Sequence, residues 1–213
     1  AMSDESDLTS SDDLDSVLLD SSVYDVIIVG AGAAGIGVGI TILHSGIENF
    51  LILDRNSVGH SFSSWPDETR FITPSFPSNS IGMLDLNSIA IGISPAFSMR
   101  VEHPTGKEYA EHLQDISEFF ELPIKEETYV ESIEKNDDLF FLETQEGTLQ
   151  AKNVIWAAGE YQYPLLNGFD GSDLCRHTST IPSYNTLEGD DFLIIGGYES
   201  GIDAAIHLSL IHI

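Results

Sequence analysis

Cysteine is nearly absent from the sequence: Cys175 is the single one among 213 residues. A lone thiol cannot form an internal disulfide or supply two cysteine ligands to a metal, and it has no partner for dithiol–disulfide exchange within the chain. We therefore expect Cys175 to be a small packing residue rather than a nucleophile. The sequence predicts no metal site.

Basic residues are also scarce, because eight Lys and Arg stand against 35 Asp and Glu, for a formal net charge of −27. Nucleic acids and anionic membranes bind cationic surfaces, so this charge excludes both as partners. Without residues 1–22, which hold seven acids and no base, the chain still carries −20. One interpretation is adaptation to a salty cytoplasm, where salt screens self-repulsion; the other is an acidic protein of no special habitat.

Long apolar runs are missing, since no stretch approaches the roughly 20 residues that cross a bilayer. The N-terminus has no basic region ahead of an apolar core, so it does not resemble a secretory signal. Residues 1–22 instead alternate Ser, Asp and Leu, which is typical of a disordered acidic leader. We expect a cytoplasmic protein whose partners are a small-molecule substrate or electron acceptor, or a second copy of the chain.

Order is expected from residue 24 onward. Residues 24–29 end in four β-branched apolar residues, which predicts a strand buried on both faces of a parallel sheet. Residues 33–45 have helical propensity and stop at Gly46, and residues 50–54 predict a second buried strand. Strand, turn, helix and strand together form one βαβ unit.

The turn of this unit carries a glycine motif, Gly-Ala-Gly-Ala-Ala-Gly at residues 30–35. In such a motif Gly30 permits the tight turn, Gly32 lets backbone N–H groups approach a pyrophosphate, and Gly35 lets helix and strand pack closely. The helix N-terminus then stabilises the phosphates. Asp54, 19 residues after Gly35, ends the second strand at the spacing of the acid that accepts hydrogen bonds from a ribose diol.

The rest of the chain predicts a mixed pattern. Residues 56–100 show little periodicity, and Thr105 can cap a helix that runs to about residue 122. Short strands are expected near residues 129–133, 139–143 and 148–150, followed by a buried-strand pattern over residues 154–159. A loop over residues 160–190 leads to a strand at residues 192–196 and a helix at residues 200–210.

Four further segments carry a family resemblance. They are Gly-His-Ser-Phe-Ser-Ser-Trp at residues 59–65, the Thr-Pro segment at residues 70–79, Val-Ile-Trp-Ala-Ala-Gly at residues 154–159, and Gly-Gly-Tyr-Glu-Ser-Gly-Ile-Asp at residues 196–203. With the first glycine motif, the chain resembles the flavoprotein oxidoreductases that have two dinucleotide-binding domains, in their flavin-containing monooxygenase-like branch. The resemblance spans about residues 23–213.

This resemblance implies a fold and a domain organisation. We expect an α/β chain with a Rossmann-like FAD-binding domain, a parallel sheet with helices on both faces plus a small antiparallel β-meander. The expected boundaries are a leader over residues 1–22, the N-terminal part of the FAD-binding domain over 23–160, an interdomain loop over 161–190, and the truncated beginning of an NAD(P)-binding domain over 191–213.

The resemblance also implies cofactor-binding residues. Tyr198 replaces the middle glycine of the second motif and would hinder a pyrophosphate, so the sequence leaves open whether NAD(P)H binds there. Phe169, Gly171 and His177 are similar to a monooxygenase motif with a spacing two residues longer. The residues implied for FAD are Gly30, Gly32, Ala33, Ala34, Gly35, Asp54, Arg55, His60, Ser61, Phe62, Trp65, Thr73, Ser75, Val130, Ala157, Ala158 and Gly159, and those for NAD(P)H are Gly196, Gly197, Ser200 and Gly201.

The function implied is that of an FAD-dependent oxidoreductase, monooxygenase-like, that takes hydride from NAD(P)H. In this architecture a later segment returns to complete the flavin site, so the chain is expected to be an incomplete half-enzyme. The alternative is a non-catalytic FAD- or nucleotide-binding fragment or short form. The sequence does not identify a catalytic acid or base.

Overall fold

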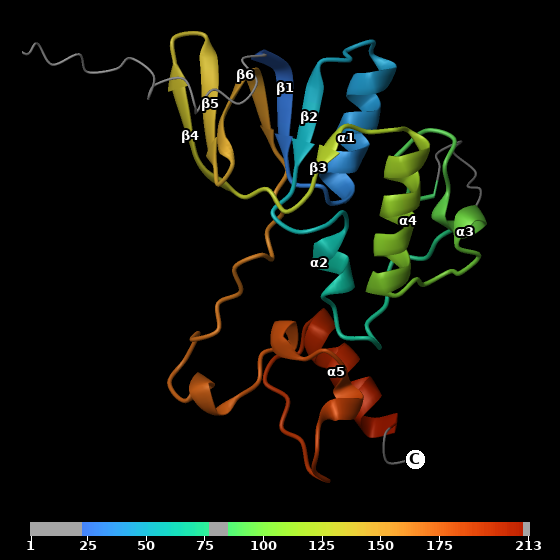
Figure 1. Ribbon diagram of the computed structural model, residues 1–213. Helices are drawn as coiled ribbons and strands as arrows, with labels where there is room; N and C mark the ends of the chain where they lie inside the picture. Colours follow the sequence, from blue (N-terminus) through green and yellow to red (C-terminus); the bar gives the residue numbers. More distant parts are fainter. Residues whose placement is uncertain (1–22, 77–84, 211–213) are drawn as a thin grey trace, which may run out of the picture.

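The computed structural model describes residues 23–76 and 85–210, which form two units in Figure 1. The leader expected over residues 1–22 lies outside the described residues. The first unit (residues 23–76 and 85–159) contains β1 (Val23–Val29), α1 (Ala33–His44), β2 (Phe50–Leu53), α2 (His60–Ser63), α3 (Pro95–Ser98), α4 (Gly106–Phe119), β3 (Ile124–Lys125), β4 (Val130–Asn136), β5 (Leu139–Thr144) and β6 (Gly147–Trp156). The second unit (residues 160–210) contains α5 (Glu199–Leu210) and the 3-10 helices η2 (Ser172–Leu174), η3 (Thr178–Thr180) and η4 (Tyr184–Thr186).

The strands form one six-stranded sheet in the order β3-β2-β1-β6-β5-β4. β1 pairs in parallel with β2 and β6, and β2 pairs in parallel with β3. β5 pairs antiparallel with both β6 and β4, and these strands form the meander. The expected α/β class, a parallel sheet extended by an antiparallel meander, is confirmed.

Strand β6 is continuous over ten residues, and the expectation of two strands, over residues 148–150 and 154–159, is wrong. Its first part pairs with β5, and Gln150 to Trp156 pair with β1. Lys152 and Asn153 interrupt the apolar pattern in the sequence, but both contact Asp25 on β1, through a 2.7 Å ion pair and a 3.0 Å hydrogen bond to its carbonyl. Pairing on both edges therefore carries the strand through its polar middle.

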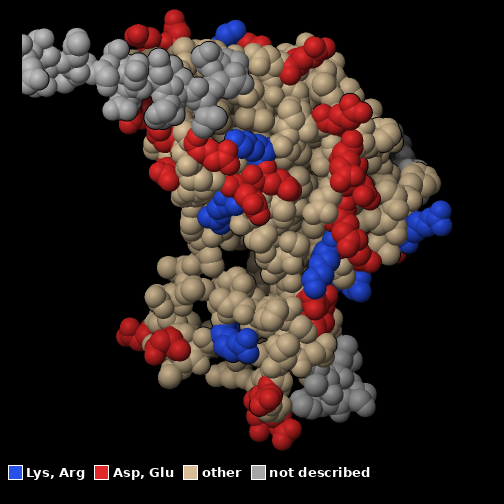
Figure 2. Space-filling view, viewed as in Figure 1, with Lys and Arg blue, Asp and Glu red and all other residues tan. Residues whose placement is uncertain are grey.

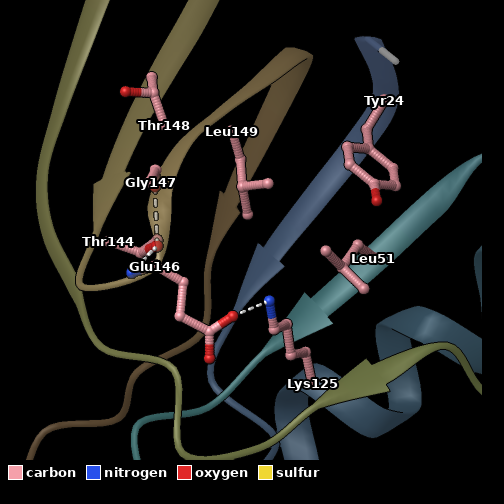
Figure 3. A pocket seen from close by; sticks show the side chains of 8 residues that line it. All are labelled: Tyr24, Leu51, Lys125, Thr144, Glu146, Gly147, Thr148 and Leu149. Atoms are coloured by element: carbon pink, nitrogen blue, oxygen red, sulfur yellow. Dashed lines mark hydrogen bonds and ion pairs between the residues drawn. The ribbon is translucent and has the colours of Figure 1, made fainter. Parts of the chain in front are cut away.

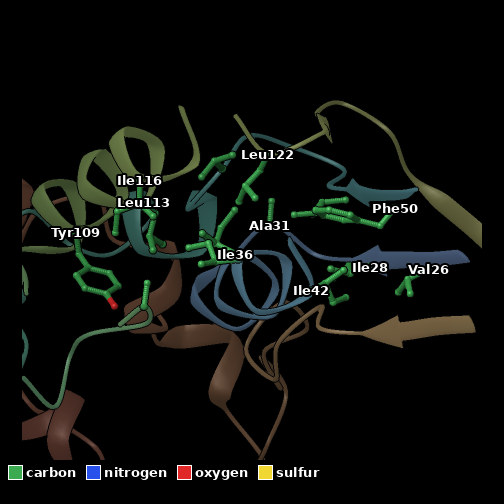
Figure 4. Close-up of a cluster of buried hydrophobic side chains, with 14 residues drawn as sticks. Val26, Ile28, Ala31, Ile36, Ile42, Phe50, Tyr109, Leu113, Ile116 and Leu122 are labelled. Atoms are coloured by element: carbon green, nitrogen blue, oxygen red, sulfur yellow. The ribbon is translucent and has the colours of Figure 1, made fainter. Parts of the chain in front are cut away.

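Apolar side chains cover both faces of the sheet. On one face, Ile28 of β1, Ile36 of α1 and Leu113 of α4 belong to a single buried cluster (Figure 4). On the other face, Ile27 and Leu53 pack against the meander residue Leu142. We expected helices on both faces, but among the described residues the long helices α1 and α4 share one face, because the curled meander already buries the other.

Helix α4 begins as the sequence predicts. The Thr105 hydroxyl accepts a hydrogen bond from the Glu108 backbone N–H at 3.2 Å, and the Glu108 carboxylate accepts one from the Thr105 N–H at 2.7 Å. This reciprocal capping box satisfies two donors that a helix start leaves unpaired. The apolar face of α4 packs against α1 in the core of the first unit.

The second unit has one small core of its own, in which Ile181 and Tyr184 pack against Ala204 and Leu208 of α5. Residues 192–196 were expected to form a buried strand, and this expectation is wrong: the structure assigns them no strand, and Leu193 is 89% exposed. The six-stranded sheet of the first unit does not include them. The predicted helix over residues 200–210 is confirmed as α5.

Acidic side chains are spread over the face shown in Figure 2, with the few Lys and Arg set among them. Several bases are paired with acids, as in the 2.6 Å contact of Lys107 with Asp67 and the ion pair of Lys125 with Glu146. Exposed pairs of this kind contribute little to stability. With 35 Asp and Glu against eight Lys and Arg, acidic side chains remain in excess. Cys175 is exposed, and the expectation that it packs in a core is wrong. None of the described helices is long and apolar enough to cross a membrane.

Candidate dinucleotide-binding site

Three parallel strands of the first unit end at the same edge of the sheet. The N–H of Gly30, after β1, donates to Leu53 of β2 at 2.7 Å, and the N–H of Ala157, after β6, donates to Val29 of β1 at 2.8 Å. The glycine turn (residues 30–35) and the segment after β6 therefore lie side by side. Ligands of open α/β sheets bind at this carboxyl edge.

Two glycines of the turn have no room for a side chain. Gly30 has φ +112°, and a Cβ on it would lie 2.9 Å from the Ala158 Cα and overlap the Ala157 carbonyl. A Cβ on Gly35 would overlap the Gly30 carbonyl oxygen, so α1 can pack this close to β1 only with glycine there. These two positions have the roles that the motif predicts.

Gly32 differs from both, because no atom lies within 4 Å of the place where its Cβ would be. It is the N-cap of α1, makes no side-chain cap, and is followed by a first turn without acidic residues. The leading N–H groups of a helix lack intrahelical partners and attract anions. The open space at Gly32 and the start of α1, with Ala33 and Ala34, therefore fit the pyrophosphate of a dinucleotide.

Asp54 lies beside this turn, directly after β2. Its Oδ2 accepts a hydrogen bond from the Ala31 N–H at 2.7 Å, and its Oδ1 accepts one from the Asn56 N–H at 2.8 Å. Each carboxylate oxygen has a further lone pair, which leaves acceptor capacity for a ribose diol. The predicted neighbours Gly30, Gly32, Gly35 and Asp54 are thus brought together.

Val130 is connected to the same edge through its neighbours. The Thr128 N–H donates to the Asp54 carbonyl at 2.7 Å, and Val130 follows as the buried first residue of β4. Ala157, Ala158 and Gly159 follow β6, and Gly159 has open space around its Cβ position. These residues border the glycine turn, as expected for one site.

Arg55 contacts Tyr163, and the sequence did not indicate this contact. Its guanidinium lies 5.6 Å from the ring centre of Tyr163, and its Nη1 donates to the Tyr163 hydroxyl at 3.5 Å. A side-chain hydrogen bond with Tyr163 raises the pKa of Tyr129. No local pattern marks Tyr129 or Tyr163, because the contact with Arg55 spans 108 positions of the chain.

The predicted residues on and after α2 have a partly structural role. α2 starts beside the turn, since the Gly59 N–H donates to the Ala31 carbonyl at 3.0 Å. His60 and Ser61 are exposed, and the His60 Nε2 lies 3.3 Å from the Ser64 hydroxyl. The rings of Phe62 and Trp65 instead join an aromatic cluster with Phe71 and Tyr109, with centroid distances of 4.5 to 5.6 Å.

Thr73 and Ser75 belong to another network. The Asn87 side-chain amide donates to the Thr73 carbonyl at 2.9 Å and to the Ser75 hydroxyl at 2.8 Å. Ser75 is only 4% exposed, so its hydroxyl serves the loop rather than an open surface. The Tyr109 hydroxyl donates to the Asn87 carbonyl at 2.7 Å, and burial, with the charge of Asp85, raises the pKa of Tyr109 to about 12.

His112 lies at the end of this network. Its Nδ1 is 2.9 Å from the Ser98 hydroxyl, and its buried Nε2 has no hydrogen-bond partner among the described residues. Burial lowers the pKa of His112 despite the opposing charges of Asp115 and Asp85. Sequence analysis missed both His112 and Asp85, which sit in segments without a recognisable motif.

One cavity of about 190 Å³ lies elsewhere on the sheet, between the β5–β6 turn and residues of β1, β2 and β3 (Figure 3). Tyr24, Leu51 and Leu149 line it, and the ion pair between Lys125 and Glu146 closes one side. None of the predicted cofactor-binding residues borders this cavity. Among the residues that the structure describes, no group of three or more His, Cys, Asp and Glu could hold a metal ion.

Comparison with known protein families gives a match that covers most of the chain. Residues 27–210 match the family described as pyridine nucleotide-disulphide oxidoreductase. The chain belongs to this family. The family match extends through both glycine turns, so the second unit is part of the resemblance.

Two curated relatives resemble the chain over most of its length. The chain is 32% identical over 192 residues to an uncharacterized oxidoreductase CzcO of Bacillus velezensis, and 29% identical over 191 residues to a CzcO-like oxidoreductase of Geobacillus kaustophilus. Each alignment covers 88% of this chain and 52% of the relative, so the chain spans about half the length of these curated relatives.

Two solved structures share the fold at lower identity. A bacillithiol disulfide reductase of Staphylococcus aureus matches with a TM-score of 0.73 and 23% identity, covering 88% of this chain and 54% of that one. A flavin monooxygenase of Stenotrophomonas maltophilia matches with a TM-score of 0.69 and 21% identity, covering 89% and 55%. Both likenesses concern the fold alone.

The second glycine turn (residues 196–201) of this family member repeats the geometry of the first. Gly196 has φ +113°, close to the +112° of Gly30, and a Cβ on Gly201 would overlap the Gly196 carbonyl as one on Gly35 would overlap Gly30. Tyr198, at the position of Gly32, is 83% exposed. Gly197 has open space and Ser200 lies in the first turn of α5, so the turn forms although the strand before it does not.

The monooxygenase-like segment of the second unit is open to solvent. Phe169 is 50% exposed, and Gly171 precedes η2. His177 caps η3, where its Nδ1 lies 2.7 Å from the Ser179 hydroxyl. The His177 ring therefore has a local structural partner.

The second unit docks on the first through residues 67–69. The Glu68 carboxylate accepts hydrogen bonds from the Ser183 hydroxyl at 2.5 Å and from the Tyr184 N–H at 3.0 Å, and the Thr69 hydroxyl donates to Asp203 at 2.6 Å. Burial raises the pKa of Glu68, but hydrogen bonds from Ser183, Tyr184 and Asn185 together lower it below the ordinary value. The ionised Glu68 carboxylate thus links the two units through these hydrogen bonds.

Proposed function

We propose that the chain binds FAD, with the pyrophosphate at the glycine turn and the start of α1, and with a ribose at Asp54. The observation that carries the proposal is the open space at Gly32 beside an uncapped helix start, while Gly30 and Gly35 are closed by backbone. Gly32 is therefore the glycine of the turn that has free space, and it is also the position at which the motif brings a phosphate close to the backbone.

We further propose that the protein is an FAD-dependent oxidoreductase, monooxygenase-like, that takes hydride from NAD(P)H. Family membership supports this proposal, as do the names of the relatives. Bound flavin would supply the redox chemistry, and the residues of this chain would bind and orient it. The second glycine turn would hold the nicotinamide dinucleotide at the start of α5, beside the exposed ring of Tyr198.

The first test is an absorbance spectrum from 300 to 550 nm, taken before and after FAD is added and the protein is desalted. We expect flavin bands that stay with the protein. In the variant Gly32→Asp the new carboxylate would fill the open space and accept from the α1 amides itself. We therefore expect this variant to lose FAD and to keep its melting temperature.

The matched control is Gly168→Asp, which adds the same charge where the nearest heavy atom to the new Cβ is 3.9 Å away on Leu165. We expect Gly168→Asp to retain FAD. Equal FAD retention by Gly32→Asp and the unsubstituted chain would contradict the proposed site, and a folded protein without any flavin would contradict FAD binding.

The second candidate function is a nucleotide-binding module without catalysis. The observation that favours it is that no strand forms before the second glycine turn, where Leu193 is 89% exposed. Steady oxidation of NADH or NADPH by the chain with added FAD would contradict this candidate. FAD retention without such oxidation would support it.

A further inference from the structure

The sequence from residue 70 to residue 101 contains almost no acid, although the chain is strongly acidic. About one residue in six of the whole chain is Asp or Glu, but Asp85 is the single acid in this segment. The Asp85 side chain contributes little charge to the surface, because the residue is 4% exposed. In the view of Figure 2, acidic side chains follow α4, and the surface over α3 is largely free of them.

Two buried polar side chains hold three parts of this segment together. The Asp85 carboxylate accepts a hydrogen bond from the Ser94 hydroxyl at 3.0 Å and another from the Ala96 N–H at 3.1 Å. The Asn87 side-chain amide donates to the Thr73 carbonyl at 2.9 Å. Buried hydrogen-bonded networks of this kind rigidify the segments that they join. Residues 72–76, 85–87 and 94–97 therefore form one fixed surface.

Large apolar side chains of this surface are exposed. Four residues that lie next in sequence to the hydrogen-bonded ones are each more than half exposed, and we call them the α3 face: Ile72, Phe76, Leu86 and Phe97. Single exposed apolar residues are common on proteins. A group of them held on a rigid frame is typical of an interaction surface.

Charges of both signs follow the α3 face along the chain. Arg100 is exposed and makes no ion pair with the described residues. Glu102 is exposed two positions later, and its charged partner is His103 at 3.8 Å. In a two-fold contact, Arg100 of one copy can meet Glu102 of the other, and the reverse pair forms as well. The charges beside the α3 face are thus complementary to a second copy of the same surface.

We propose that the α3 face is the surface through which two copies of this chain form a symmetric dimer. Each copy has a formal charge of −27, so a contact through an acidic face would bring like charges together. The α3 face avoids this repulsion, because the single acid of its segment is buried. Burial of the four apolar side chains favours association. This inference goes beyond the proposed function and does not depend on FAD binding.

The test measures the mass of the unsubstituted chain by sedimentation equilibrium over a wide range of concentrations, in low salt and in about 1 M NaCl. We expect the mass of one chain at low concentration and twice that mass at high concentration. Salt screens the repulsion between the two copies, so the dimer should be tighter in the NaCl solution.

Two variants place an acid on the α3 face. We expect Leu86→Glu and Phe97→Glu each to weaken the dimer by about tenfold or more, because a buried interface does not accommodate an unpaired charge. The matched control is Leu174→Glu, which adds the same charge at an exposed leucine of η2 in the second unit and should leave the dimer unchanged. All three replaced side chains are exposed, so the melting temperatures should stay the same.

A charge exchange tests the two-fold arrangement. Arg100→Glu places like charges opposite each other and should weaken the dimer by about threefold. The double variant Arg100→Glu with Glu102→Arg reverses both charges and should restore the affinity of the unsubstituted chain. Failure of this restoration would contradict the pairing of Arg100 with Glu102 across the dimer.

Other outcomes would overturn the inference as a whole. One is the mass of a single chain at every concentration in both salt conditions. Another is a Leu86→Glu protein that dimerises like the unsubstituted chain, because a different surface would then hold the dimer. An equal loss in Leu174→Glu would mean that added charge alone separates the copies. Binding of a monomer to phosphatidylcholine vesicles, lost in Leu86→Glu, would assign the α3 face to a lipid surface instead.

Discussion

The Asp54 carboxylate accepts a hydrogen bond from the Ala31 backbone N–H, with 2.7 Å between nitrogen and Oδ2. The bond joins the end of β2 to the glycine turn after β1, and the second carboxylate oxygen holds the Asn56 N–H. Asp54 therefore fixes the shape of the edge at which we propose that a ribose binds. Its substitution should affect both the fold and the ligand.

We expect Asp54→Ala to lower the free energy of unfolding by about 1–3 kcal/mol, because it leaves partly buried backbone amides without an acceptor. FAD affinity should fall in the same variant. Thermal unfolding and the flavin spectrum measure the two effects. Asp138→Ala, in the exposed turn between β4 and β5, is the control and should change neither; an Asp54→Ala protein as stable as the unsubstituted chain would contradict the prediction.

The capping box of α4 predicts a smaller and purely structural effect. Thr105→Ala removes the hydroxyl that accepts from the Glu108 N–H, and we expect a loss of about 1 kcal/mol in the free energy of unfolding. Thr148→Ala is the control, since that hydroxyl bonds only to the exposed Glu143 side chain. Urea unfolding of both variants measures the difference, and equal midpoints would show that the cap does not stabilise the helix.

Glu68 predicts a pH dependence for the contact between the units. Its pKa is lowered in the folded chain, so its charged form stabilises the fold above the ordinary value of 4.5. This stabilisation is lost as the pH falls through the lowered pKa. Thermal unfolding from neutral pH to about pH 3 should therefore show a steeper loss of stability for the unsubstituted chain than for Glu68→Gln.

The control for this experiment is Glu188→Gln, an exposed carboxylate of the same unit. It should follow the unsubstituted chain across the pH range. Parallel curves for Glu68→Gln and the unsubstituted chain would mean that the hydrogen bonds to Ser183 and Tyr184 do not contribute to stability.

The net charge of −27 predicts that salt stabilises the protein. Like charges repel in the compact state, and salt at about 1 M shortens the screening length to about 3 Å. The melting temperature should therefore rise from low salt to molar NaCl. Scanning calorimetry across this range measures it, with KCl as a check against a specific ion effect, and a flat melting temperature would contradict the repulsion argument.

The sequence by itself determined the elements whose interactions are local. The β1–turn–α1–β2 unit follows from four apolar β-branched residues, three glycines and Asp54 within about one βαβ length. The capping box of Thr105 and Glu108 spans three positions, and it was predictable for the same reason. The position of Asp54 beside the glycine turn follows from the parallel pairing of β1 and β2.

Tertiary structure alone decided the rest, because the interactions join residues far apart in the chain. Tyr163 reaches Arg55 across 108 positions, and Ser183 reaches Glu68 across 115. β6 is continuous because β1 and β5 pair with its two edges, and residues 192–196 lie outside the six-stranded sheet despite their apolar sequence. A hydrogen-bond partner supplied by a distant segment leaves no pattern in the local sequence, so these features required the folded chain.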